Sequence, residues 1–68
     1  MITEIGLTAG EIWQYLDKYN ETSFSKLSKA IGRDRQLVLM SLGWLAREGH
    51  VKLVKEGKDY RITLLRRE

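Results

Sequence analysis

The chain has 68 residues, no cysteine, 43% hydrophobic residues and a formal net charge of +3. The lack of cysteine excludes disulfides and thiolate metal sites, and a chain this short buries only roughly 60% of its unfolded surface. No apolar run approaches the roughly 20 residues that cross a bilayer, and the first ten residues do not have the pattern of a signal peptide. We expect one cytoplasmic domain over residues 1–68. Of the features that usually stabilise so small a core, oligomerisation is the one that remains open.

The charge is distributed unevenly along the chain. Residues 1–21 hold one lysine and four acidic residues, a net charge of −3, whereas residues 22–68 hold eleven Lys and Arg and five acidic residues, a net charge of +6. A basic segment of this size favours an anionic partner. The alternative is a solvated surface with a few additional lysines, because charge runs usually face solvent.

The first predicted helix covers residues 9 to 19 or 20. Thr8 and Glu11 have the spacing of a capping box, which makes Thr8 the predicted N-cap. Apolar residues then recur with a helical period at Ala9, Ile12, Leu16 and Tyr19. Trp13 lies beside this stripe and widens the apolar face beyond what one packing surface needs.

Two further helices are predicted at residues 26–31 and from 35 to about 48, with the spacing of a helix-turn-helix. Ser25 is the predicted N-cap of the first of these helices, and Asp34 that of the second. Each helix is followed by a glycine, Gly32 and Gly49, which can adopt the left-handed conformation that often ends a helix.

After residue 49 the hydrophobic period changes from 3.6 to 2, which predicts a β-hairpin. If Glu56 and Gly57 are the central residues of its turn, Leu53 lies opposite Tyr60. In that register the apolar residues of both strands share one face. Residues 66–68 are predicted to form a frayed tail.

The order helix, short extended segment, helix, helix and β-hairpin resembles a winged helix-turn-helix domain over the whole chain, with the hairpin as the wing. The residues that carry this resemblance are Leu27, Ile31, Gly32, Val38, Leu42, Leu45, Gly49, Val51, Gly57, Tyr60, Arg61 and Ile62. A closer resemblance, to small stand-alone prokaryotic winged-helix proteins of uncharacterised function, rests on residues 8–10, 12–13, 16 and 42–48. The resemblance implies a mainly α fold with a three-helix core and a β-hairpin. It does not by itself show DNA binding, because winged helices also serve as protein-interaction modules.

The second helix of the predicted helix-turn-helix has an apolar outward face. Val38, Leu42 and Leu45 form its core stripe, and in the resembling family several positions outside that stripe face the DNA groove. We expect these positions to form a partner surface, most simply for a second copy of the chain, and its residues are Leu37, Met40, Gly43, Trp44 and Trp13. Two alternatives stay open: packing of Leu37 and Trp44 against the first helix or the N-terminal arm, and a DNA face that uses methyl and backbone contacts.

The polar residues around the same helix are the candidates for contacting double-stranded DNA, together with the basic residues of the wing. They are Arg33, Arg35, Gln36 and Arg47 around the helix, and Lys55, Lys58 and Arg61 on the wing. In the resembling family a basic wing tip contacts phosphate or the minor groove, and phosphate contacts give salt-dependent affinity without sequence information. The alternative is an edge hairpin that its lysines protect from aggregation, and the interleaved Glu56 and Asp59 weaken the case for DNA.

The sequence gives little basis for catalysis. His50 is the only histidine, and it has no second metal ligand and no Ser or Cys partner at a recognisable spacing. We expect no enzyme, no metal, no cofactor, no small-molecule substrate and no membrane partner. Two functions are left: a small DNA-binding or transcription-regulator-like protein, which we place first, and a homodimeric interaction module.

Overall fold

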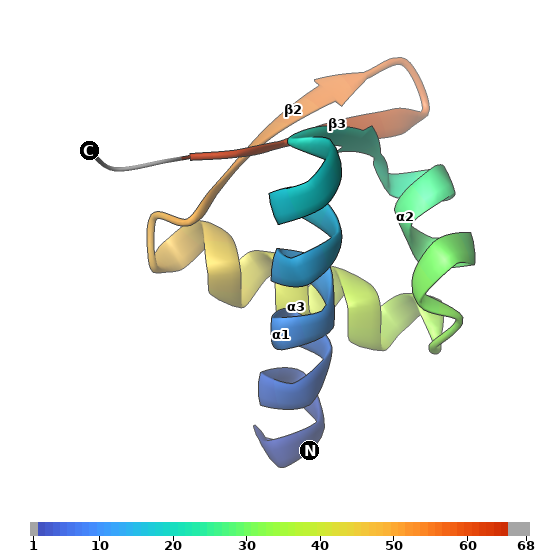
Figure 1. Cartoon of the computed structure of the whole chain (residues 1–68). Helices are drawn as coiled ribbons and strands as arrows, with labels where there is room; N and C mark the ends of the chain where they lie inside the picture. Colours follow the sequence, from blue (N-terminus) through green and yellow to red (C-terminus); the bar gives the residue numbers. More distant parts are fainter. Residues whose placement is uncertain (1, 66–68) are drawn as a thin grey trace.

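The computed structural model describes residues 2–65, so the tail expected at residues 66–68 lies outside the described residues (Figure 1). In chain order its elements are α1 (Ile2–Tyr19), β1 (Glu21–Ser23), α2 (Phe24–Ile31), α3 (Arg35–Arg47), β2 (Val51–Glu56) and β3 (Asp59–Leu64). The strands form one antiparallel sheet in the order β1-β3-β2. The predicted order of elements is confirmed. None of the described helices has the length and apolar character needed to cross a membrane.

The first helix begins at Ile2, well before the predicted N-cap. Thr8 does not cap the helix: it is fully buried within it, on the side that packs into the core. Half-buried Ile5 continues the inward stripe of Ile12 toward the N-terminus, and α1 has extensive contact with α3. The predicted capping box is therefore wrong, because tertiary packing extends the helix through it and Glu11 pairs with Arg33 instead.

Helix α2 begins at Phe24 because Ser23, rather than the predicted Ser25, is its N-cap. The Ser23 hydroxyl accepts a hydrogen bond from the backbone N–H of Lys26 at 3.2 Å. At the other end Gly32 has φ 73°, the left-handed conformation that the sequence predicted.

Helix α3 has almost the predicted limits. The Asp34 carboxylate accepts a hydrogen bond from the backbone N–H of Gln36 at 3.2 Å, as expected of an N-cap. The helix ends at Arg47, and Gly49 follows it with φ 78°. The N-cap Asp34 and the left-handed Gly49 thus set the two ends of α3, the helix that faces the hairpin.

The predicted hairpin forms, but the predicted register is wrong by two residues. The observed pairs include Leu53 with Ile62, Lys55 with Tyr60, and Glu56 with Asp59. The central turn residues are therefore Gly57, with φ 61°, and Lys58. A glycine at the first central position is typical of a type II′ turn. Because a shift of two residues preserves the alternation of side chains, the apolar residues of both strands still share one face.

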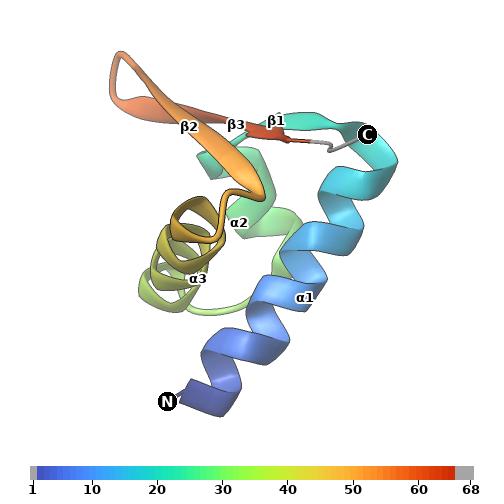
Figure 2. The ribbon, with the colours of Figure 1, turned by 90° about the vertical axis from the view of Figure 1, so that its left-hand side faces the viewer.

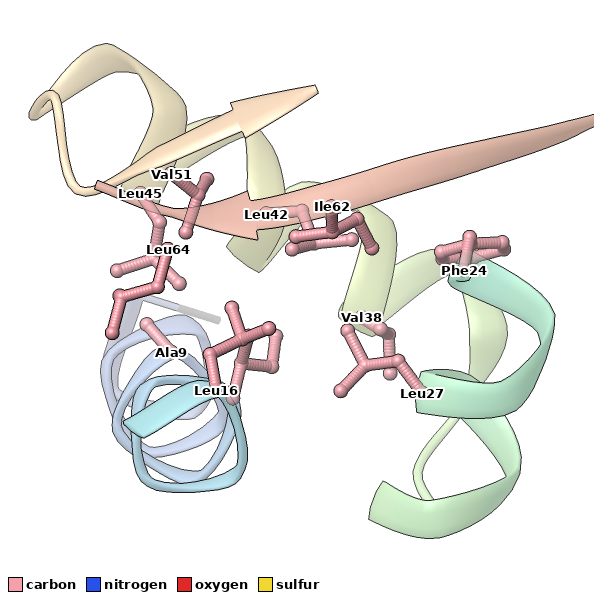
Figure 3. Close-up of a cluster of buried hydrophobic side chains, with 11 residues drawn as sticks. Ala9, Leu16, Phe24, Leu27, Val38, Leu42, Leu45, Val51, Ile62 and Leu64 are labelled. Atoms are coloured by element: carbon pink, nitrogen blue, oxygen red, sulfur yellow. The ribbon is translucent and has the colours of Figure 1, made fainter. Parts of the chain in front are cut away.

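The core lies between that face of the sheet and the three helices (Figure 3). Its members are Ala9, Ile12, Leu16, Phe24, Leu27, Val38, Leu42, Leu45, Val51, Ile62 and Leu64. Figure 2 shows α3 nearly end-on beneath the hairpin, with α1 beside it. The turn of the hairpin extends past the core, so side chains near it are left accessible above the start of α3.

Candidate nucleic-acid interface

A groove of about 480 Å³ lies between the start of α3 and the hairpin. Its lining residues are Phe24, Asp34, Arg35, Gln36, Leu39, Lys58 and Tyr60. The residues come from α2, the cap and first turns of α3, and the hairpin, which are far apart in the sequence. The groove thus exists only because the helix-turn-helix and the wing (residues 51–64) are packed side by side.

Two polar side chains of α3 face this groove. The guanidinium of Arg35 lies over the ring of Phe24, 5.1 Å from its centroid, which is a cation–π contact. Gln36 is exposed, and the hydrogen bond to Asp34 involves only its backbone N–H. The start of α3 therefore presents one guanidinium and one side-chain amide, both groups that hydrogen-bond base edges or phosphates.

The wing supplies two lysines on the same side. Lys55 pairs across the strands with Tyr60, so both side chains project from the sheet face that covers α3. Lys58 follows Gly57 in the turn and lines the groove itself. Both lysines are exposed.

The wing is tied to the helix-turn-helix by Asp59. Its carboxylate accepts hydrogen bonds from the backbone N–H of Tyr60 at 2.8 Å and from that of Ser25 at 3.3 Å. These bonds hold the pKa of the Asp59 carboxyl below its usual value, and the bond from Tyr60 has the largest effect. The positive charge of Arg35 lowers this pKa further. Asp59 thus fixes the base of the turn against the start of α2.

Arg61 lies on the opposite face of the sheet from α3. Its guanidinium donates to Glu56 at 3.0 Å and to Glu21 at 2.7 Å, and this pairing raises the pKa of Arg61. The side chain was expected to contact phosphate. The structure instead directs it away from the groove and neutralises its charge locally.

Arg33 is also occupied within the chain. It donates to both carboxylate oxygens of Glu11, at 2.6 and 3.1 Å, and joins the α2–α3 loop to α1. This hydrogen-bonded pair lowers the pKa of Glu11. Arg33 was expected at the nucleic-acid surface, but its position makes it a link between elements of the fold.

The outward side of α3 continues from the groove along the helix. Gln36, Met40, Gly43 and Arg47 recur at helical spacing and are exposed. A Cβ at Gly43 would meet open space, so this surface can be approached closely. Leu37 was expected on the partner surface, but only 8% of it is exposed, because its side chain packs within the domain.

A second, smaller groove of about 320 Å³ lies where α3 meets the first turns of α1. Ile2, Ile5, Gly6 and Trp44 line it, and Trp44 is 52% exposed. Trp44 therefore borders the N-terminal part of α1 and also keeps half of its surface in solvent. The two grooves share no lining residue.

Four lining residues of the larger groove were not predicted to contact nucleic acid: Phe24, Asp34, Leu39 and Tyr60. The wrong hairpin register paired Tyr60 with Leu53 instead of Lys55, and so hid its position near the turn. Gly57-Lys58 as the centre of the turn was the sequence signal that would have predicted the position of Tyr60 opposite Lys55. No local signal predicts the contact of Phe24 with Arg35, because it depends on how α2 packs.

Three helices, a short first strand and a β-hairpin, in this order and with this pairing, define a winged helix-turn-helix protein. The chain belongs to the family described as winged helix-turn-helix domain (DUF2582), whose model matches residues 1–64. Uncharacterized protein MJ1608 of Methanocaldococcus jannaschii is similar to it, with 38% identity over 64 residues that make up 90% of each chain.

Two solved structures are also similar. The solution NMR structure of protein BT2368 from Bacteroides thetaiotaomicron has a TM-score of 0.79 and 24% identity, over 91% of this chain and 76% of that chain; this likeness shows the fold alone. A HOP2 structure, described in terms of DNA recognition, protein interaction and homologous DNA pairing, has a TM-score of 0.69 and 31% identity, over 84% of this chain and 97% of that chain.

Proposed function

We propose that this chain is a cytoplasmic DNA-binding module of the transcription-regulator type, and that it binds duplex DNA through α3 and the wing. The observation that carries the proposal is the groove in which Arg35, Gln36 and Lys58 converge. Within the described residues, neither Arg35 nor Lys58 forms an ion pair, whereas Arg33 and Arg61 do. Neither cation is held by a close carboxylate in this part of the chain, so both can pair with an anionic partner.

The chemistry of the surface suits a duplex. The major groove of B-DNA is about 12 Å wide and admits one helix. With α3 in that groove, Arg35 and Gln36 lie at the N-terminal end that reads base edges in helix-turn-helix proteins. Leu39 and Met40 present methyl groups for the methyl of thymine, and Lys55 and Lys58 reach flanking phosphates.

The neighbours support the same function. The HOP2 structure is described in terms of DNA recognition, and 31% identity over most of this chain favours a related use of the surface. A winged helix is a binding scaffold, so we infer binding rather than catalysis.

Fluorescence anisotropy with labelled mixed-sequence duplexes at 50 to 200 mM salt tests the proposal. Changing Lys55 and Lys58 to Ala should weaken binding similarly for all sequences. It should also make the slope of log K against log salt less steep, by the amount expected for the loss of about two phosphate contacts. The matched control is Lys18→Ala with Lys52→Ala, since both lysines are exposed and Lys52 projects from the sheet face opposite α3. It makes the same change in net charge away from the groove and should leave the slope unchanged. Absence of binding at 50 mM salt, or equal slopes for the two double variants, would overturn the proposal.

A second candidate function is a homodimeric interaction module, which the half-exposed indole of Trp44 beside Ile2 favours. Trp44→Glu should then convert a dimer to a folded monomer, because burial of an unpaired carboxylate is costly. Light scattering and circular dichroism measure mass and fold together. A wild-type monomer at high micromolar concentration excludes this function.

A further inference from the structure

One flank of α1 is apolar and open from its first turn to its middle. At 100° per residue, Ile2, Gly6, Gly10 and Trp13 fall within about 80° of one another around the helix axis. All four are exposed, Ile2 at 87% and Trp13 at 42%. In Figures 1 and 2 the first turns of α1 extend beyond α3, away from the sheet, and no other helix or strand of residues 2–65 runs alongside them there.

The two glycines of this flank have no role within the domain that explains them. Glycine destabilises a helix interior relative to alanine. Neither Gly6 nor Gly10 has a positive φ, and a Cβ at either would meet no atom within 4 Å. A helical glycine that the fold does not require is often a position where another backbone approaches closely.

Trp44 enlarges the same surface. It shares the 320 Å³ groove with Ile2, Ile5 and Gly6, so the α1 flank and the indole are continuous. An indole of roughly 250 Å² leaves on the order of 100 Å² exposed at each of Trp13 and Trp44. When the exposed surface of Ile2 and of the groove is added, the accessible area that two copies can bury together approaches the roughly 1,000 Å² that a specific interface needs.

We propose that this surface binds the same surface of a second copy, with the two α1 helices antiparallel. This inference rests on the proposed self-association and names where it occurs. The order along the flank is large, small, small, large, which reads the same from either end. An antiparallel pair therefore sets Ile2 of each copy beside Trp13 of the other and brings the glycines together at the crossing, as a two-fold interface requires.

The charges on α1 are compatible with this arrangement. Glu4 and Glu11 lie on the opposite side of the helix from the flank, and Glu11 pairs with Arg33. Asp17 falls on the flank by helical angle, but it lies one turn beyond Trp13, so an antiparallel partner whose Ile2 meets Trp13 ends before it. Two copies can therefore meet without facing carboxylates, although residues 1–21 carry a net charge of −3. The N-terminal end of α1 lies far from the hairpin in Figure 1, so the dimer leaves the groove between α3 and the wing open on each copy.

Sedimentation velocity of the full chain over a concentration series tests the proposal. The wild type should form a dimer. Changing Gly6 and Gly10 together to Ala should raise the melting temperature of the dilute protein, because helix propensity rises, and also weaken dimerisation by roughly tenfold or more. The same two positions changed to Leu should abolish the dimer.

Gly43→Ala is the matched control, since Gly43 is a helical glycine whose Cβ would also meet open space. It should raise stability and leave dimerisation unchanged. A wild-type monomer at every concentration would contradict self-association itself. A dimer of unchanged affinity in both double variants would show that the copies meet elsewhere. Neither result would contradict DNA binding through the groove, which the anisotropy series measures separately.

Discussion

Thr8 is buried in α1, and its Oγ1 has no hydrogen-bond partner among the described residues. A buried hydroxyl that lacks a partner destabilises the fold by its desolvation. Thr8→Val keeps the branched shape and removes the hydroxyl, so it should raise the free energy of unfolding by about 1 to 2 kcal/mol. Urea denaturation measures the change, with exposed Thr3→Val as the control. A loss of stability in Thr8→Val would show that the hydroxyl is hydrogen-bonded in solution.

The Asp59 carboxylate gives the stability a defined pH dependence. Its pKa is below the usual value because Tyr60 and Ser25 donate backbone N–H bonds to the ionised form. A lowered pKa stabilises the fold above the unfolded value of about 3.9, and this contribution is lost as the pH falls through the folded value.

The stability difference between the wild type and Asp59→Asn should therefore be present at pH 7 and shrink below about pH 4. Thermal unfolding from pH 7 to 2.5 measures it. A difference that stays constant over this range would mean that the ionised form of Asp59 has no special role.

At the scale of elements, β1 determines where α2 begins. Ser23 is the last residue of β1, pairs with Arg61, and has the extended backbone of an N-cap, φ −86° and ψ 155°. Ser23→Ala should cost about 1 kcal/mol of stability, whereas Ser25→Ala should be close to neutral. Chemical denaturation of the two variants compares them directly, and equal losses would contradict the assignment of the cap.

Local signals predicted those features that local chemistry controls. Asp34 and the glycines at 32 and 49 mark helix ends through their own backbone or side-chain geometry, and the structure confirms them. The start of α1 depends on packing between distant segments, whereas the hairpin register follows from a local turn at residues 57–58 that the prediction misplaced. Thr8 is buried inside α1 instead of capping it, and the type II′ turn is centred on residues 57 and 58 instead of 56 and 57.

The same distinction applies to the candidate site. The sequence identified Lys55 and Lys58, which are exposed because a turn exposes them. It also grouped Arg33 and Arg61 with them, but Arg33 pairs with a carboxylate 22 residues away. Arg61 pairs with one carboxylate 40 residues away and with another five residues away, across the hairpin turn. Only the tertiary structure shows which basic residues are paired and which are available.

At the scale of the whole molecule, two surfaces point in different directions. The groove between α3 and the wing holds the cations Arg35 and Lys58 within a mostly apolar lining, whereas the lining residues shared by the α1 flank and Trp44 carry no charge. A dimer through the flank would carry two copies of the groove, and such a dimer binds half-sites a helical turn or a multiple of it apart, with one turn about 34 Å. The Leu variants at Gly6 and Gly10 should then bind DNA more weakly and with a smaller salt slope than the wild type.

A titration of the ¹⁵N-labelled protein with a mixed-sequence duplex at low salt, followed by amide chemical shifts, tests the proposed interface most directly. The largest changes should fall at Arg35, Gln36, Leu39 and Met40 in α3 and at residues 55–60 in the wing. The outer-face residue Arg61 and the first turns of α1 should change least. Shifts concentrated on α1, or no shifts at several-fold excess of DNA, would contradict the assignment of the interface.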